Sequence, residues 1–297
     1  MVDSFYERRQ TGLIRLAYSP DKNLYLFLKR GGVFSAALFN SGLTQIFPRD
    51  QWLEKVHSAG EAYAKAIPLS PLGLLLFGLS LQVRDGRTEE ISDPGQVSQY
   101  LKSEAGRSEP SLVYLNWQRS SGLVLFPEKN SQPYSVFVSE ETVRDEAGLS
   151  PVFYEAWGPQ CMASAFSLDA SVDIWKEYQL RRLFAEICNL MLARFRTLAG
   201  RALVESLVRV MTSFTSERDL DISISSHKIL DCEVFLSSEV AAKYYRLFLA
   251  EMFEHCAVVV GPRLLAASLR ENIANLPAPD LDLIDAHALL PRGYFYD

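Results

Sequence analysis

The sequence has no long uninterrupted hydrophobic segment. Its longest apolar run is "PLGLLLFGLSL", residues 71 to 81, whereas a helix that spans a bilayer needs about 18 residues or more. The opening residues, "MVDSFYERRQ", carry early charges and lack the apolar core of a secretion signal. We therefore expect a cytoplasmic protein without a membrane span.

The sequence is also poor in cysteine and has no excess of positive charge. Its four cysteines are far apart and form no C-x-x-C pair: Cys161, Cys188, Cys232 and Cys256. This spacing favours reduced, buried thiols over a disulfide framework. A net charge of −6 argues against a nucleic-acid partner, because phosphate recognition needs a strongly basic face.

Motifs of catalytic and metal sites are missing as well. No G-x-S-x-G pentapeptide marks a serine nucleophile, and no H-E-x-x-H or paired C-x-x-C marks a metal site. The four histidines are scattered along the chain: His57, His227, His255 and His287. We predict a non-enzymatic protein with no catalytic residue, no cofactor and no metal. An enzyme built from residues distant in sequence stays open as an alternative.

Alternating strands dominate the beginning of the chain. Hydrophobic residues make up 48% of the sequence, and its 297 residues suggest two or three cores. From Gly12 the chain reads as a strand, a polar turn, the strand "LYLFLKR", Gly31-Gly32 and the strand "VFSAALF". We predict an antiparallel meander, then a helix from Asp50. The run from 71 to 81 suits either a buried strand or a helix.

The segment Lys29-Arg30-Gly31-Gly32 has two interpretations. A phosphate-binding loop would need a glycine-rich turn that leads into the N-terminus of a helix. A strand-like segment follows Gly32 instead, and neither G-x-G-x-x-G nor G-x-x-x-x-G-K-[ST] is present. The pattern favours a tight hairpin turn, with a phosphate cradle as the alternative.

The middle of the chain repeats the pattern of its beginning. Residues 84–110 are polar, contain three glycines and two prolines, and include a short helix after Asp93-Pro94. We predict a linker there, between a first domain at 1–83 and a second meander and helix unit at 111–172. The recurrence indicates either an internal duplication or the likeness that any two meanders share.

The hydrophobic period becomes helical from Asp173 onward. We predict a helical domain at 173–297, with two similar helix–glycine–helix arms interrupted at Gly200 and Gly261. Its proline-punctuated end, from Leu276, is expected to lie as a tail on the surface. The sequence as a whole predicts an α+β fold: antiparallel meander and helix units, duplicated or not, followed by an all-α region.

Basic residues are concentrated between Lys176 and Arg209. They could contact an acidic partner or an anion, or they could be the solvated face of ordinary helices. Together with the hairpin, they supply the candidate contact residues: Lys29, Arg30, Arg181, Arg182, Arg194, Arg196 and Arg201.

The hairpin region resembles PATAN-type domains, which are interaction modules of bacterial signalling proteins. The matching features are Gly12-Leu13-Ile14-Arg15-Leu16, the apolar strand from Leu24 to Leu28, the Gly31-Gly32 turn, and the segment from Val33 to Ala37. The resemblance covers residues 12–70. A looser second copy covers 111–170, where Pro133 stands in place of the turn glycine. The family has no catalytic residues, so the resemblance implies an interaction module.

Two functions follow from these patterns. The first is a non-enzymatic bacterial signalling adaptor or scaffold that mediates protein–protein interaction, with a homodimer through the helical region as one arrangement. The alternative is a regulatory protein that senses a small ligand, either a nucleotide or another anion, through the basic residues of the hairpin and helices.

Overall fold

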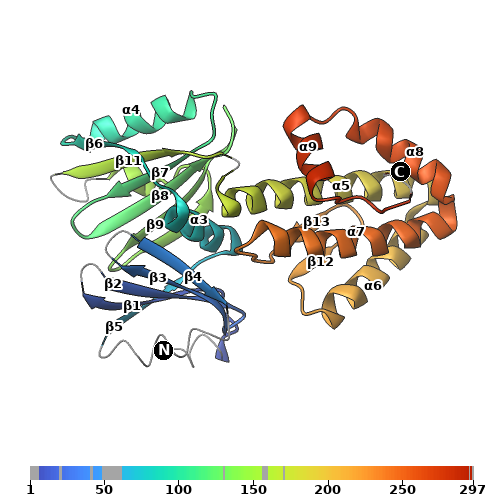
Figure 1. Ribbon diagram of the computed structural model, residues 1–297, viewed down its shortest axis with the longest axis horizontal. Helices are drawn as coiled ribbons and strands as arrows, with labels where there is room; N and C mark the ends of the chain where they lie inside the picture. The colour runs from blue at the N-terminus through green and yellow to red at the C-terminus, as the bar shows by residue number, and fades with distance from the viewer. Residues whose placement is uncertain are drawn as a thin grey trace. The chain divides into compact units, whose positions relative to one another are not determined.

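The computed structural model divides the chain into two compact units, Met1–Val172 and Asp173–Asp297 (Figure 1). It describes residues 7–19, 22–40, 43–48, 62–129, 131–155, 160–169, 171–293 and 295. The first unit contains two antiparallel sheets, and the second is mostly helical. The predicted α+β class is therefore confirmed.

Five antiparallel strands form the first sheet, in the order β4-β3-β2-β1-β5. They are β1 (Gly12–Ser19), β2 (Lys22–Lys29), β3 (Gly32–Asn40), β4 (Leu43–Pro48) and β5 (Tyr63–Pro68). Alternation along β2 sends Leu24 and Leu26 to one buried face and Tyr25 and Phe27 to the other. The predicted meander is thus present.

Helix α3 (Pro71–Gln82) covers the Tyr25 side of this sheet, where Phe77 lies against both aromatic rings. It is the apolar run whose secondary structure the sequence left open. Ser70 caps the helix by accepting a hydrogen bond from Gly73 N, and Pro71 occupies its first turn. Most of its residues are buried, which explains why no amphipathic period marked it as a helix.

Six strands form the second sheet, in the order β10-β9-β8-β7-β11-β6. They are β6 (Arg87–Ile91), β7 (Ser111–Asn116), β8 (Ser120–Phe126), β9 (Tyr134–Ser139), β10 (Val143–Ala147) and β11 (Cys161–Ser167). In both sheets four consecutive strands form a meander and the next strand pairs with the first of them. The internal duplication itself stays a prediction.

The segment at 84–110 differs from the predicted linker. It contains β6 and helix α4 (Pro94–Ala105), and β6 pairs with β11 at the edge of the second sheet. Val97 and Leu101 of α4 are buried in the core of that sheet. The segment looked like a linker because an edge strand and a surface helix expose most of their residues. The helix predicted from Asp50 lies outside the described residues, except Tyr63, which begins β5.

A carboxylate connects α3 to the second sheet. Asp145 on β10 accepts hydrogen bonds from Ser70 N, from Ser70 Oγ at 3.1 Å and from the Tyr134 hydroxyl. Lys65 adds a second connection through its Nζ, which donates to the Ser139 carbonyl at 3.0 Å. Since the amino end of a helix carries partial positive charge, a carboxylate is favourable beside Ser70.

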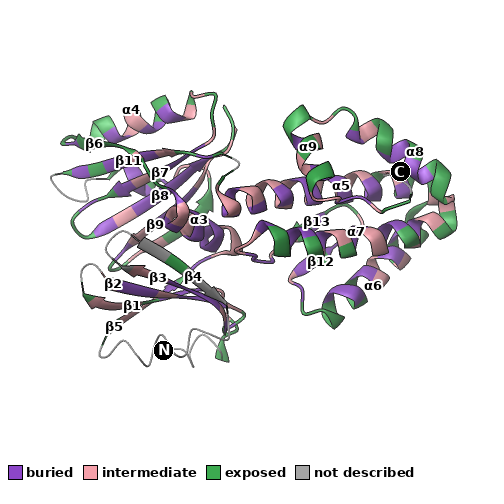
Figure 2. Ribbon diagram, viewed as in Figure 1, coloured by how far each residue is buried: buried purple, intermediate pink, exposed green. Residues whose placement is uncertain are grey.

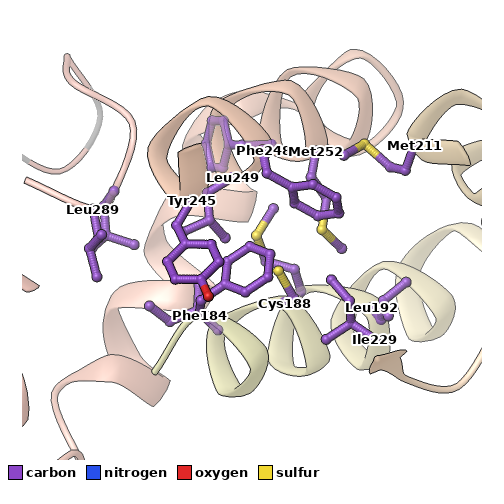
Figure 3. Close-up of a cluster of buried hydrophobic side chains, with 14 of the residues drawn as sticks. Phe184, Cys188, Leu192, Met211, Ile229, Tyr245, Phe248, Leu249, Met252 and Leu289 are labelled. Atoms are coloured by element: carbon purple, nitrogen blue, oxygen red, sulfur yellow. The ribbon is translucent and has the colours of Figure 1, made fainter. Parts of the chain in front are cut away.

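The second unit is built on two parallel helices, α5 (Asp173–Ala199) and α7 (Ser238–Val260). They begin together, because Asp173 accepts hydrogen bonds from the backbone and hydroxyl of Ser238. Further along, Phe184 stacks on Tyr245 with ring centroids 4.2 Å apart and also meets Phe248 edge-on (Figure 3). These contacts hold the two helices in register.

Each parallel helix continues through a glycine into a second helix, as predicted. Gly200 leads into α6 (Arg201–Glu217), and Gly261 leads into α8 (Pro262–Ile273). The same number of residues separates Gly200 from Gly261 and Phe184 from Tyr245. The two stacked rings therefore occupy equivalent positions in two equivalent arms.

The carboxy-terminal segment is not a simple surface tail. It forms α9 (Ala278–Ala286) and buries Ile284, Leu289 and Leu290 in the core of the helical unit, as Figure 3 shows for Leu289. Prolines and aspartates made the segment look solvated, whereas its few aliphatic residues supply the contacts. A short hairpin of β12 (Ile222–Ile224) and β13 (Ile229–Asp231) joins the same core.

We predict that the glycine of each arm is required by its backbone. Gly200 and Gly261 have φ values of 84° and 90° with extended ψ, a region that other residues rarely enter. Gly200→Ala and Gly261→Ala should each lower the free energy of unfolding by about 1–3 kcal/mol in chemical denaturation. Gly106→Ala is the control, since Gly106 has an ordinary φ of −81°. Equal stability of all three variants would contradict this account.

We also predict that Asp145 holds the first unit together. Asp145→Ala removes the acceptor of the Ser70 and Tyr134 hydrogen bonds and should lower the free energy of unfolding by about 2 kcal/mol. Its exposed neighbour on β10 is the control, and Glu146→Ala should change stability by no more than about 0.5 kcal/mol. Urea denaturation measures both, and a similar effect of the two variants would exclude the predicted role.

Candidate interaction surface

The basic hairpin forms a tight turn, as the sequence favoured. Lys29 pairs with Gly32 across it, and Arg30 and Gly31 have φ values of 48° and 84°. Two consecutive positive φ values are typical of the two-residue turns that join twisted strands. The turn amides are already bonded: Gly31 N donates to Gln10 O at 2.8 Å and Arg30 N to Thr11 Oγ1 at 3.4 Å. The backbone of this turn is therefore not free to cradle a phosphate.

The helical arginines do not form one continuous basic face. Arg181 is largely enclosed, with its side chain 11% exposed: its guanidinium donates to Glu177 Oε1 at 3.2 Å and to the backbone oxygens of Asp231 and Glu233. Arg182 pairs with Asp280, which α9 supplies. Apart from Glu177, these partners come from segments far along the chain, so the sequence could not show that they enclose the two arginines.

The other arginines lie near the carboxyl end of α5. Arg196 is exposed and hydrogen-bonded to His227 Nδ1 at 2.8 Å, and Arg201 pairs with Glu205 at 3.2 Å. Arg194 is half-buried. The candidates Lys29 and Arg30 belong to the first unit, and all the helical arginines belong to the second.

Buried carboxylates surround Arg181 in the helical unit. The Glu177 side chain is fully buried, and burial raises its pKa to about 7. Arg181 opposes that rise and Asp231 adds to it. The Tyr245 hydroxyl donates to Asp231 Oδ2 at 2.6 Å, which ties the network to the stacked rings. The sequence does not reveal this cluster, because Glu177 resembles any other charged residue on a helix.

Three of the four thiols, those of Cys161, Cys188 and Cys256, are buried. Burial raises the pKa of Cys161 to about 11 and that of Cys256 to about 12, and it raises the pKa of Cys188 as well. A nucleophilic cysteine needs the opposite shift, toward the thiolate. Within the described ranges, no three His, Cys, Asp or Glu side chains gather as a metal site would require. No described helix is both long and apolar enough to cross a bilayer.

Exposed aliphatic side chains gather where the two arms turn. We call them the junction surface; its members are Leu198, Leu203, Val258, Val259 and Leu264. Leu198 and Val259 lie two residues before their glycines, and Leu203 and Leu264 lie three residues after them. Val258 is 88% exposed and Leu264 is 53% exposed. Both junctions lie at the same end of the unit, and both carry exposed residues (Figures 1 and 2).

The parallel arms explain why both junctions lie at one end of the unit. Phe184 stacks on Tyr245, and each ring lies the same number of residues before the end of its helix, so with a rise of about 1.5 Å per residue the last turns of α5 and α7 lie at similar heights. At each glycine the chain reverses, so the neighbouring residues form the outer end of the unit. The role of both glycines could be predicted from the sequence. The signal for the junction surface was overlooked: it is the aliphatic residues that lie outside the buried hydrophobic stripes of the helices.

The chain matches no known protein-family model, no curated protein and no solved structure. The interpretation of the junction surface therefore depends on its own residues.

We predict that Glu177 makes the stability of the helical unit depend on pH. Its folded pKa of about 7 exceeds the ordinary value of 4.5, so its contribution is fully present below pH 4.5 and is lost as the pH rises through 7. Glu177→Gln cannot ionise. The free energy of unfolding of the variant minus that of the original chain should therefore rise between about pH 5 and pH 8, as measured by urea denaturation. Glu205→Gln, at an exposed site, is the control. If the difference between Glu177→Gln and the original chain stays constant over this range, the predicted role of Glu177 is wrong.

Proposed function

We propose that this chain is a non-enzymatic bacterial signalling adaptor that binds another protein through its helical unit and works in the cytoplasm. The observation that carries the proposal is the junction surface. Leaving aliphatic groups in water forfeits about 25 cal/mol for each Å² that could be buried. Five such side chains at one end of a folded unit are typical of a surface that a partner covers.

The signalling part of the proposal rests on the sequence resemblance in the first unit. Residues 12–70 resemble PATAN-type modules, and their Gly31 turn and meander fit the strand pattern of that resemblance. The second sheet follows the same strand path, as a second module at 111–170 would. In this proposal the sheets are the signalling modules and the helical unit is the docking element.

The alternative, a sensor of nucleotides or other anions, has less support. It would use Lys29, Arg30 and the arginines from 181 to 201. The turn amides are occupied within the chain, and Arg181 donates to buried oxygens. A thermal-shift titration with nucleotides distinguishes the two functions, because a ligand that binds only the folded state raises the melting temperature. The adaptor proposal predicts no shift.

We predict that charging the junction surface abolishes partner capture. The double variant Val258→Asp with Leu264→Asp should lose the proteins that the original chain captures, after crosslinking, from the cells in which it is native. Leu230→Asp is a matched control, since Leu230 is 54% exposed on β13 and is not part of the junction surface. It should retain the partners, because it leaves the junction surface intact.

Circular dichroism of the three proteins checks that the variants fold. Capture of the same proteins by the folded double variant would contradict the adaptor proposal. A dimer lost only in the double variant, seen by light scattering, would make a second copy of the chain the partner.

A further inference from the structure

The junction surface combines its aliphatic side chains with an excess of positive charge. Residues 194–205 and 254–264 contain four arginines and two glutamates, in a chain whose net charge is −6. Three of these arginines are exposed: Arg196, Arg201 and Arg263. Arg263 has no ion pair among the residues that the structure describes. The end of the helical unit is thus locally positive on a negative protein.

The two arms present this chemistry twice. Leu203 and Leu264 are equivalent in their arms, and an exposed arginine accompanies each of them, Arg201 before the first and Arg263 before the second. A leucine beside an arginine guanidinium on each arm is complementary to a ligand that carries aliphatic groups next to carboxylates. Carboxylates would be held by charge-assisted hydrogen bonds, which are stronger than neutral ones.

The charge of the junction surface argues against two other binding partners, a second copy of the chain and an anionic bilayer. In a symmetric dimer the junction surface would face itself, which would bring its arginines against those of the second copy. An anionic bilayer would attract the arginines, but a flat surface would also approach the exposed Glu205 and Glu254. A protein segment can place its acidic groups opposite the arginines alone.

We propose that the junction surface binds an amphipathic segment of a partner protein, whose apolar face covers the aliphatic side chains and whose flanking acidic residues pair with the arginines. This inference rests on the proposed adaptor function and adds the chemistry of the partner. Recognition by apolar anchors spaced along one face of a helix is a common mode of peptide binding. Electrostatic complementarity then supplies specificity and raises the rate of association.

The test is a selection from a random peptide library of about 20 residues, long enough for several helical turns. The immobilised full chain serves as bait, and binding of selected peptides is measured by fluorescence anisotropy. We expect enriched peptides with aliphatic residues three or four positions apart and a net negative charge. Their dissociation constants should rise about tenfold or more in Arg263→Glu and in the double variant Leu203→Asp with Leu264→Asp.

Two control variants test whether the loss of peptide binding depends on where the substitution lies. Arg119→Glu reverses an exposed charge in the first unit, and Leu230→Asp charges an exposed leucine outside the junction surface. Both should bind the selected peptides as the original chain does. Added salt should weaken binding to the original chain, because ions screen exposed charges.

The outcomes separate this inference from the adaptor proposal. Neutral or basic peptides that need the junction leucines would overturn the acidic partner and leave the adaptor intact. Peptides that bind every variant equally would overturn both. A third outcome would assign the surface to a membrane instead. The original chain would then cosediment with phosphatidylglycerol vesicles but not with phosphatidylcholine vesicles, and the leucine double variant would lose this binding.

Discussion

The contact of Phe184 with Tyr245 between two parallel helices is the constraint on which the helical unit depends. The rings lie 4.2 Å apart at equivalent positions of α5 and α7, so they fix the register of the arms. Parallel helices in register end together, and this brings the glycine turns to one end. The exposed side chains of the junction surface are a consequence of that register.

The buried charged residues are connected to the contact of Phe184 with Tyr245. Tyr245 donates to Asp231, Arg181 binds the backbone of Asp231, and Glu177 completes the group from the preceding turn of α5. Removing one member of a buried ionic group leaves the others without compensation, which is strongly destabilising. The cluster therefore explains why a glutamate is tolerated in the core, and it separates Arg181 from the arginines at the surface.

Local patterns predicted much of the fold. Alternation revealed the meanders, Gly31 revealed a turn, and the interruptions at Gly200 and Gly261 revealed two arms. The linker at 84–110 was wrong because an exposed edge strand and a surface helix have the composition of a loop. The junction surface was harder to predict, because exposure of a leucine depends on how α5 and α7 align and not on its neighbours in sequence. Asp231, Glu233 and Asp280, which bind Arg181 and Arg182 from far along the chain, were invisible for the same reason.

A photocrosslink from Val258 tests the central claim most directly, since this side chain is 88% exposed in the junction surface. A photoreactive phenylalanine analogue would replace Val258 in one protein and Leu230 in another, and both would be irradiated in living cells. The account predicts a protein crosslinked only from position 258, at a segment rich in aliphatic and acidic residues. Absence of that product, or the same product from position 230, would contradict it.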